Sequence, residues 1–157
     1  MIQRIQSVFL ALVFVVGMVL FISPVLGFTS YENTFVMNAY HTINSIDHTV
    51  ASKNIGIGAM QGLISLLALI SIFLFKKRQL QIKLCKLNML LVAFQIAAIV
   101  LYIDIAQKAI SPEHIGNVVI GIKYGAIIPI LSWIFLYLSI RYIKKDEDLI
   151  RSADRLR

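Results

Sequence analysis

A run of 19 residues at positions 87–105 reads LNMLLVAFQIAAIVLYIDI and carries a single charge, Asp104, next to its end. At about 1.5 Å per residue, a helix of this length matches a hydrocarbon layer roughly 30 Å thick. Three further runs are comparably long and apolar, at residues 8–26, 55–75 and 124–142. The sequence therefore predicts four membrane-spanning helices.

The composition agrees with a membrane protein. Of the 157 residues, 59% are apolar and 15% are charged, and the mean hydropathy is +0.82. A soluble domain carries about 25% charged residues, and a disordered chain is poor in apolar residues. The one cysteine, Cys85, cannot form a disulfide within the chain. We therefore expect residues 1–157 to form one membrane domain, with the first apolar run retained rather than cleaved as a signal peptide.

Basic residues are distributed unevenly between the segments that join these runs. Twelve fall on one side, namely Arg4, Lys76, Lys77, Arg78, Lys83, Lys86, Arg141, Lys144, Lys145, Arg151, Arg155 and Arg157, and three fall on the other, Lys53, Lys108 and Lys123. The positive-inside rule then places both termini in the cytoplasm. Residues 27–54 and 106–123 become outer loops, residues 76–86 a cytoplasmic loop, and residues 143–157 a cytoplasmic tail. Because this sorting accounts for the net charge of +7, we expect no nucleic-acid partner.

The predicted fold is all-α, an integral membrane four-helix bundle with a cytoplasmic C-terminal helical tail. Residues 34–41 alternate partly and favour β structure, so a small strand or hairpin is an alternative for that part of the first outer loop. In the second outer loop, Ser111, Pro112 and Glu113 form a helix-start pattern. We expect that helix to run into the fourth span and to bend at Gly116, Gly121 or Pro129.

Polar and small residues recur at helical spacing within the runs. Asn88, Gln95 and Tyr102 are seven residues apart and share one face of the third helix. The predicted polar seam consists of Gly58, Gln61, Gly62, Ser65, Asn88, Gln95, Gly125 and Ser132. One interpretation is helix packing, with glycines allowing close approach and amides bonding between helices. The other is a polar pathway or ligand cavity, which is less favoured because no acid or base lies at mid-membrane depth.

The depths of three of these residues agree. At about 1.5 Å per residue, Ser65 and Gln95 lie roughly 15 Å below the outer edge, and Ser132 roughly 12 Å. We expect all three to face the bundle interior. An unpaired amide in hydrocarbon is costly, so Gln95 should bond to a hydroxyl or carbonyl of a neighbouring helix.

No arrangement of residues indicates catalysis. His41, Asp47 and His48 are spaced too loosely for a metal site, and Cys85 has no histidine placed beside it by the sequence. We therefore expect no catalytic residue, no cofactor and no metal, and a protein that is not an enzyme.

The tail combines an apolar face with interleaved acids and bases. Glu147 and Arg151 form a favourable i,i+4 pair. The residues expected to dock a partner are Glu147, Leu149, Ile150, Arg151, Asp154, Arg155 and Leu156. A solvated helix end with no partner is the alternative.

The two ends of the chain carry a resemblance. The opening MIQRIQS and the closing KKDEDLIRSADRLR resemble those of a family of small four-span inner-membrane proteins of Bacteroidetes-type bacteria, catalogued as a domain of unknown function. The resemblance implies the four-span topology and a location in the bacterial inner membrane. It implies no activity or cofactor.

These observations lead to two functional hypotheses. The first is a non-enzymatic accessory or scaffolding subunit of a membrane protein complex, which contacts the lipid bilayer and docks a membrane or cytoplasmic protein through its C-terminal helix. The alternative is a small binder or transporter of lipids or hydrophobic ligands, with a cavity between the four helices.

Overall fold

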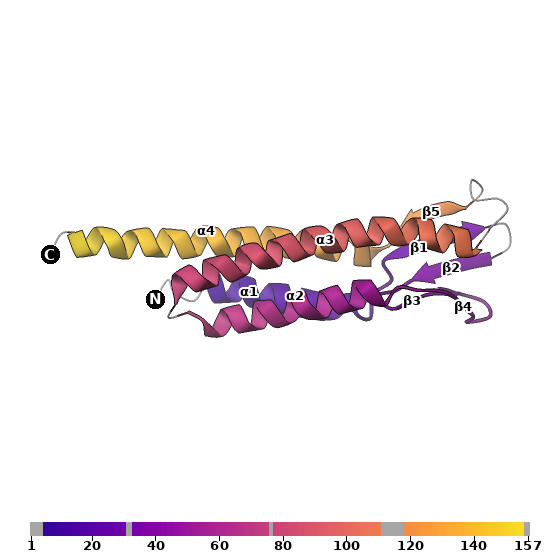
Figure 1. The fold of residues 1–157 in the computed structure, drawn as a ribbon, viewed down its shortest axis with the longest axis horizontal. Coiled ribbons are helices and arrows are strands. Elements are labelled where there is room, and N and C mark those ends of the chain that lie inside the picture. The colour runs from indigo at the N-terminus through magenta and orange to yellow at the C-terminus, as the bar shows by residue number, and fades with distance from the viewer. Residues whose placement is uncertain (1–4, 31–32, 76, 111–117, 156–157) are drawn as a thin grey trace.

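The computed structural model describes residues 5–30, 33–75, 77–110 and 118–155, the last six of these by their backbone alone. Its helices lie side by side, and a five-stranded sheet lies at one end of them (Figure 1). They are α1 (Ile5–Leu20), α2 (Ile55–Phe73), α3 (Arg78–Ile110) and α4 (Ile127–Arg155), with a short 3₁₀ helix, η3 (Tyr124–Ala126), before α4. We call the two ends of the bundle the sheet end and the tail end, the latter being where α1 begins and α4 finishes.

Three of the helices, α2, α3 and α4, are long and apolar enough to span a membrane. Large apolar side chains cover their outward faces, among them Leu63 on α2, Phe94 and Leu101 on α3, and Trp133 on α4. These apolar helices suggest contact with a lipid bilayer. Helix α1 is equally apolar but has 16 residues, roughly 24 Å at about 1.5 Å per residue.

The first apolar run is shorter as a helix than its hydropathy predicts. Helix α1 ends at Leu20, and Ser23 donates a hydrogen bond from Oγ to the Val19 carbonyl oxygen at 2.7 Å. Pro24 follows, and the residue before a proline is disfavoured in helical conformation. The predicted span 8–26 is therefore wrong at its C-terminal end, because residues 21–26 turn and enter the sheet.

The predicted cytoplasmic loop 76–86 is also wrong, because α3 begins at Arg78. Glutamine, lysine and leucine are good helix formers, and a buried face at Gln81, Cys85 and Asn88 continues the period of the apolar run. Of the charges that indicated a loop, Lys83 and Lys86 lie on the exposed face of this helix. Its 33 residues, roughly 50 Å at about 1.5 Å each, extend beyond the predicted span 87–105 at both ends.

The all-α prediction is wrong, because five strands form one antiparallel sheet in the order β4-β3-β2-β1-β5. The strands are β1 (Leu26–Ser30), β2 (Asn33–Met37), β3 (His41–Asn44), β4 (Val50–Lys53) and β5 (Val119–Ile122). Strand β2 falls in the segment 34–41, for which a small strand or hairpin was the alternative, and β3 begins at the last residue of that segment, His41. Together, strands β1 to β4 form a meander in which each strand pairs with the next one along the chain.

Strand β5 replaces part of the helix that was predicted before the fourth span. Residues 111–117, which include the proposed helix start, lie outside the described residues. The next residues, VIGI, are β-favouring and pair with β1, with Ile122 opposite Leu26 and Val119 opposite Thr29. Pro129 lies in the first turn of α4, where a proline costs no helical hydrogen bond.

The buried apolar residues form two clusters along the bundle. The one at the sheet end joins Phe28 and Met37 of the sheet to Ile57 of α2 and Ile99 of α3. The other lies toward the tail end and contains Leu10, Val13, Ile64, Val92 and Leu136, which come from all four helices. All four helices contribute to both clusters, so the sheet packs on the bundle as a whole.

Candidate functional site

Helix α3 presents three buried amides at seven-residue spacing, and each donates a hydrogen bond to α2. Gln81 Nε2 donates to the Ser71 carbonyl oxygen at 3.0 Å, Asn88 Nδ2 to the Ile64 carbonyl oxygen at 3.1 Å, and Gln95 Nε2 to Gln61 Oε1 at 2.9 Å. We call Gln81, Asn88 and Gln95 the amide ladder. Seven residues is the repeat at which helices keep one face toward each other.

The ladder follows the antiparallel run of the two helices. As the donor position rises along α3, the acceptor position falls along α2, from Ser71 to Ile64 to Gln61. One repeat further along, the Tyr102 hydroxyl lies against Gly56, where a Cβ atom would come within 2.6 Å of it. The ladder therefore fixes the register of α2 against α3 over most of their shared length.

Several polar atoms inside the bundle have no hydrogen-bond partner among the described residues. They are Gln6 Oε1, Gln81 Oε1, Asn88 Oδ1, Gln95 Oε1, Ser132 Oγ and Ser139 Oγ. Ser65 is buried and its hydroxyl accepts a bond from Gln61 Nε2 at 3.2 Å. Apart from the two serine hydroxyls, these atoms are amide carbonyl oxygens, which carry no charge and can accept a hydrogen bond from a donor.

The predicted glycines differ in what they contact. Gly62 has no atom within 4 Å of the position a Cβ would take, so it does not bring two helices together. Gly58 donates its N–H to the Ala39 carbonyl oxygen at 3.0 Å, and Gly125 donates to that of Pro24, also at 3.0 Å. Both contacts join a helix to the strand region rather than to another helix.

Gly17 of α1, which the sequence did not single out, is a glycine at which α1 approaches α2 closely. A Cβ there would overlap Gln61 Nε2 and would lie 2.7 Å from Ser65 Oγ. Gly17 therefore packs directly on the polar seam of α2. The signal available in the sequence was a lone glycine in the middle of an apolar run.

The remaining chemically reactive groups do not form a site. Cys85 is fully buried beside the hydroxyls of Ser71 and Ser139. Among the described residues, no group of three or more His, Cys, Asp or Glu side chains is placed to hold a metal ion.

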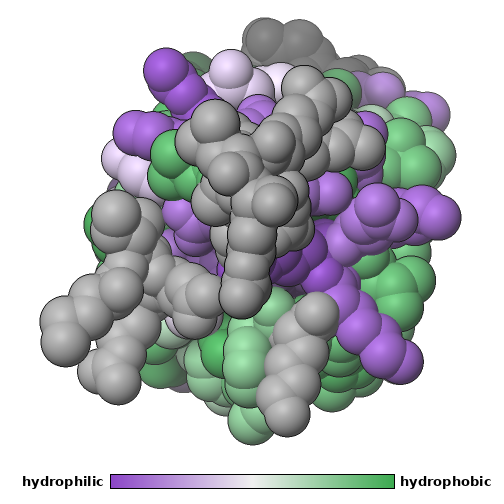
Figure 2. Space-filling model, turned by 90° about the vertical axis from the view of Figure 1, so that its left-hand side faces the viewer, coloured by the Kyte–Doolittle hydropathy of each residue, from purple (hydrophilic) through white to green (hydrophobic). Residues whose placement is uncertain are grey.

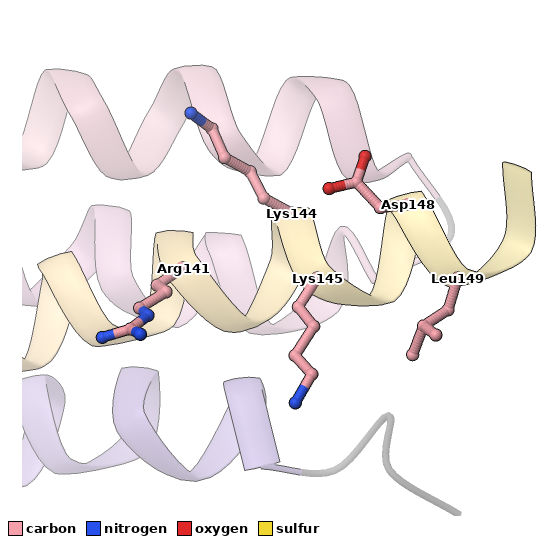
Figure 3. Close-up of a pocket in the computed structure, with 5 residues that line it drawn as sticks. All are labelled: Arg141, Lys144, Lys145, Asp148 and Leu149. Carbon is pink, nitrogen blue, oxygen red and sulfur yellow. The ribbon is translucent and has the colours of Figure 1, made fainter. Parts of the chain in front are cut away.

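At the tail end, α4 carries the second set of candidate residues. Arg78 at the start of α3 donates from Nη1 to the Asp146 carbonyl oxygen at 3.3 Å, which ties α4 to the bundle. A pocket of about 560 Å³ lies beside this point and is lined by Arg141, Lys144, Lys145, Asp148 and Leu149 (Figure 3). Of the predicted docking residues, Glu147 is half-buried and Leu149 is exposed. The side chains of Ile150, Arg151, Asp154 and Arg155, and all of Leu156, lie outside the described part of the chain.

Gly17, which packs on the polar seam, and Gly62, which faces open space, give a matched pair of substitutions. We expect Gly17→Ala to lower the free energy of unfolding by about 1–3 kcal/mol, because the added methyl would displace Gln61 from Ser65. Gly62→Ala should be neutral, or stabilising by up to about 1 kcal/mol, since alanine favours the helix and the space is open. Thermal unfolding of both variants in detergent measures this, and equal effects would contradict the packing described for Gly17.

The ladder is tested at Gln95. We expect Gln95→Leu to destabilise the bundle by roughly 0.6–2 kcal/mol, because Gln61 Oε1 loses its donor. Gln95→Glu should cost more, since a charge is expensive at this depth. In a double-mutant cycle, Gln61→Leu together with Gln95→Leu should cost less than the sum of the two single substitutions. A Gln95→Leu variant more stable than the parent would show that the bond contributes nothing.

The comparisons with known proteins give a family but no activity. A comparison with curated proteins found no match. A family model described as a domain of unknown function, DUF4293, matches residues 2–156, which is nearly the whole chain. This confirms the resemblance seen at the two ends of the sequence. The four helices, the five-stranded sheet and the amide ladder are thus features of a chain that belongs to the DUF4293 family.

Proposed function

We propose that the protein is a non-enzymatic accessory or scaffolding subunit of a membrane protein complex, and that it docks a partner protein through the end of α4. The proposal includes four membrane-spanning helices with both termini in the cytoplasm of a bacterial cell and the sheet on the outer side of the inner membrane. The family has no known activity, so the argument rests on the shape and charge of the chain.

The observation that supports docking is that α4 continues beyond the rest of the bundle. It runs without interruption to Arg155 and projects past the ends of α2 and α3 (Figure 1). After Asp146, which contacts Arg78, it continues through residues 147–155, roughly 13 Å of helix at about 1.5 Å per residue. A few basic residues are enough to end a membrane-spanning helix at the membrane surface. The additional length of α4 therefore supports a role outside the bilayer.

The charge of this projecting helix supports a protein partner. Residues 146–155 contain four acids and two bases in an interleaved order. A helix that lies on an anionic membrane surface is instead rich in lysine and arginine on its polar face. Interleaved charges beside Leu149 and Ile150 are typical of a helix that packs on another protein.

The folded chain supports the proposed orientation. The fold brings the turn between α2 and α3 to the same end as the projecting part of α4, and hydrophilic side chains gather across that end (Figure 2). Lys77, Lys83 and Lys86 are exposed there. The opposite end carries Lys53, Lys108 and Lys123. The basic residues counted along the sequence are thus also separated in space, as the positive-inside rule requires.

The alternative function, a ligand binder with a cavity between the helices, has less support. Both pockets described in this structure are lined by α4 residues at the tail end rather than by residues from several helices. The alternative therefore stays a prediction that no contact among the described residues favours.

The orientation can be tested by cysteine labelling. Asp47, in the turn between β3 and β4, and Asp148, on α4, are both exposed, whereas the native Cys85 is buried. We expect a membrane-impermeant maleimide to label Asp47→Cys in cells whose outer membrane alone is permeabilised. Asp148→Cys should react only after the inner membrane is opened. Labelling of both positions from the same side would contradict the proposed topology, and the parent chain is the control for Cys85.

Docking can be tested with a photo-crosslinking amino acid placed at Ser152 and, as a control, at Asp47. We expect a defined crosslinked protein from position 152 and none from position 47. Deletion of residues 149–157 should abolish recovery of that protein without changing the amount of chain in the membrane, because the contact from Arg78 to the Asp146 carbonyl oxygen, which ties α4 to the bundle, is kept. Recovery that is unaffected by the deletion, or equal crosslinking from both positions, would overturn docking through α4.

A further inference from the structure

Three basic side chains lie within two turns of α4, close to the point where its apolar stretch ends. Arg141, Lys144 and Lys145 are all exposed and line the 560 Å³ pocket together. The two lysines diverge to either side of the helix, with Arg141 one turn nearer the sheet end (Figure 3). Arg141 and Lys145 also line a second pocket, of about 230 Å³, with Leu138 and Tyr142. The two pockets therefore share their cationic groups.

These cations are not neutralised by other described residues. Within residues 5–149 as the structure describes them, no hydrogen bond or ion pair occupies the side chains of Arg141, Lys144 or Lys145. Among the described residues, Asp148 is the one acid that lines the pocket, and the neighbouring Asp146 is buried. Three positive charges against one negative charge leave the pocket cationic, and it is therefore complementary to an anion.

An apolar ridge leads from the pocket toward the middle of α4. Ile134 and Tyr137 are exposed and lie seven and four residues before Arg141, so they occupy the same face of the helix as its guanidinium group. Leu138 joins them at the wall of the second pocket. Tyr142 is held by Phe9 of α1, with their ring centroids 5.5 Å apart in a stacked arrangement. A cationic pocket is thus continuous with an apolar surface long enough for the upper part of an acyl chain.

We propose that this surface binds an anionic glycerophospholipid of the phosphatidylglycerol type. Its phosphate would lie against Arg141 and Lys145, which line both pockets, with Lys144 adding positive charge from the other side of the helix. One acyl chain would lie along Ile134, Tyr137 and Leu138. A soluble phosphate or nucleotide would use the cations but not the adjoining apolar ridge. Basic pockets on membrane helices at this level are suited to lipid headgroups. The inference requires only contact with a bilayer, so it holds whether or not α4 also docks a protein.

The test is native mass spectrometry of the full chain in detergent with added phosphatidylglycerol. We expect the triple variant Arg141→Gln, Lys144→Gln, Lys145→Gln to bind this lipid with an affinity lowered by about tenfold or more, because each cation near an anionic surface contributes severalfold to affinity. The matched control removes three exposed cations elsewhere at the tail end, as Lys77→Gln, Lys83→Gln, Lys86→Gln. It should keep binding within about twofold, since its charges do not line the pocket.

Three further measurements distinguish a phospholipid site from diffuse charge attraction and from a site for phosphate alone. Asp148→Asn should leave phosphatidylglycerol binding unchanged or tighten it, because it removes a negative charge from an anion site. Phosphatidylethanolamine should bind more weakly than phosphatidylglycerol, and millimolar inorganic phosphate should not displace the lipid. Equal loss in both triple variants would mean diffuse attraction to the basic end and would overturn the proposal. Equal binding of the zwitterionic lipid, or displacement by phosphate alone, would also overturn it.

Discussion

The hydrogen bonds from Gln81, Asn88 and Gln95 of α3 to α2 are the interaction on which the rest of the structure depends. In a bilayer, apolar side chains gain little by moving from lipid to a helix interface, so packing and interhelical hydrogen bonds must hold helices together. Each bond contributes modestly, but an amide left facing hydrocarbon is costly, so the register with all three bonds formed is favoured over its neighbours. Once α2 and α3 are in register, Gly17 of α1 can pack on Gln61 and Ser65, and the C-terminal part of α3 reaches the sheet.

The sequence predicted the features that depend on local pattern. Length and hydropathy identified the helices, and the seven-residue spacing of Asn88 and Gln95 identified the buried face of α3. The same spacing extends back to Gln81, but the lysines around it indicated a loop, because charge along a sequence does not distinguish a loop from the exposed side of a helix. Gly17 was missed for a related reason: a single glycine in an apolar run shows nothing of the residues opposite it, and its partners Gln61 and Ser65 lie on another helix.

The sequence offered a small strand or hairpin at residues 34–41 as an alternative, but it did not predict the five-stranded sheet. Strands β1 to β4 are short, and each alone fits a polar loop with scattered aromatic residues. Strand β5 is separated from β1 by the whole of α2 and α3, yet Ile120 lies opposite Phe28. Such pairing depends on the bundle bringing the end of α1 and the start of α4 together, where Gly125 bonds to Pro24. The sheet thus depends on the bundle, and the bundle depends on the amide ladder. Of these, only the amide ladder follows a local periodicity that can be recognised in the sequence.

The order of charges along α4 separates two uses of the same helix. Arg141, Lys144 and Lys145 come first and lie next to the apolar ridge, where a lipid phosphate would meet them. The acids begin at Asp146, and from there the helix has passed the bundle and carries both signs of charge. A basic band is sufficient to orient a helix in a membrane, but it does not require a pocket or a stacked tyrosine beside it. Likewise, a helix with interleaved acids and bases is not needed to bind lipid. Because the two segments follow one another on one rigid helix, a lipid held at the first would set the depth of α4 in the bilayer, and hence how far the second extends toward a protein partner.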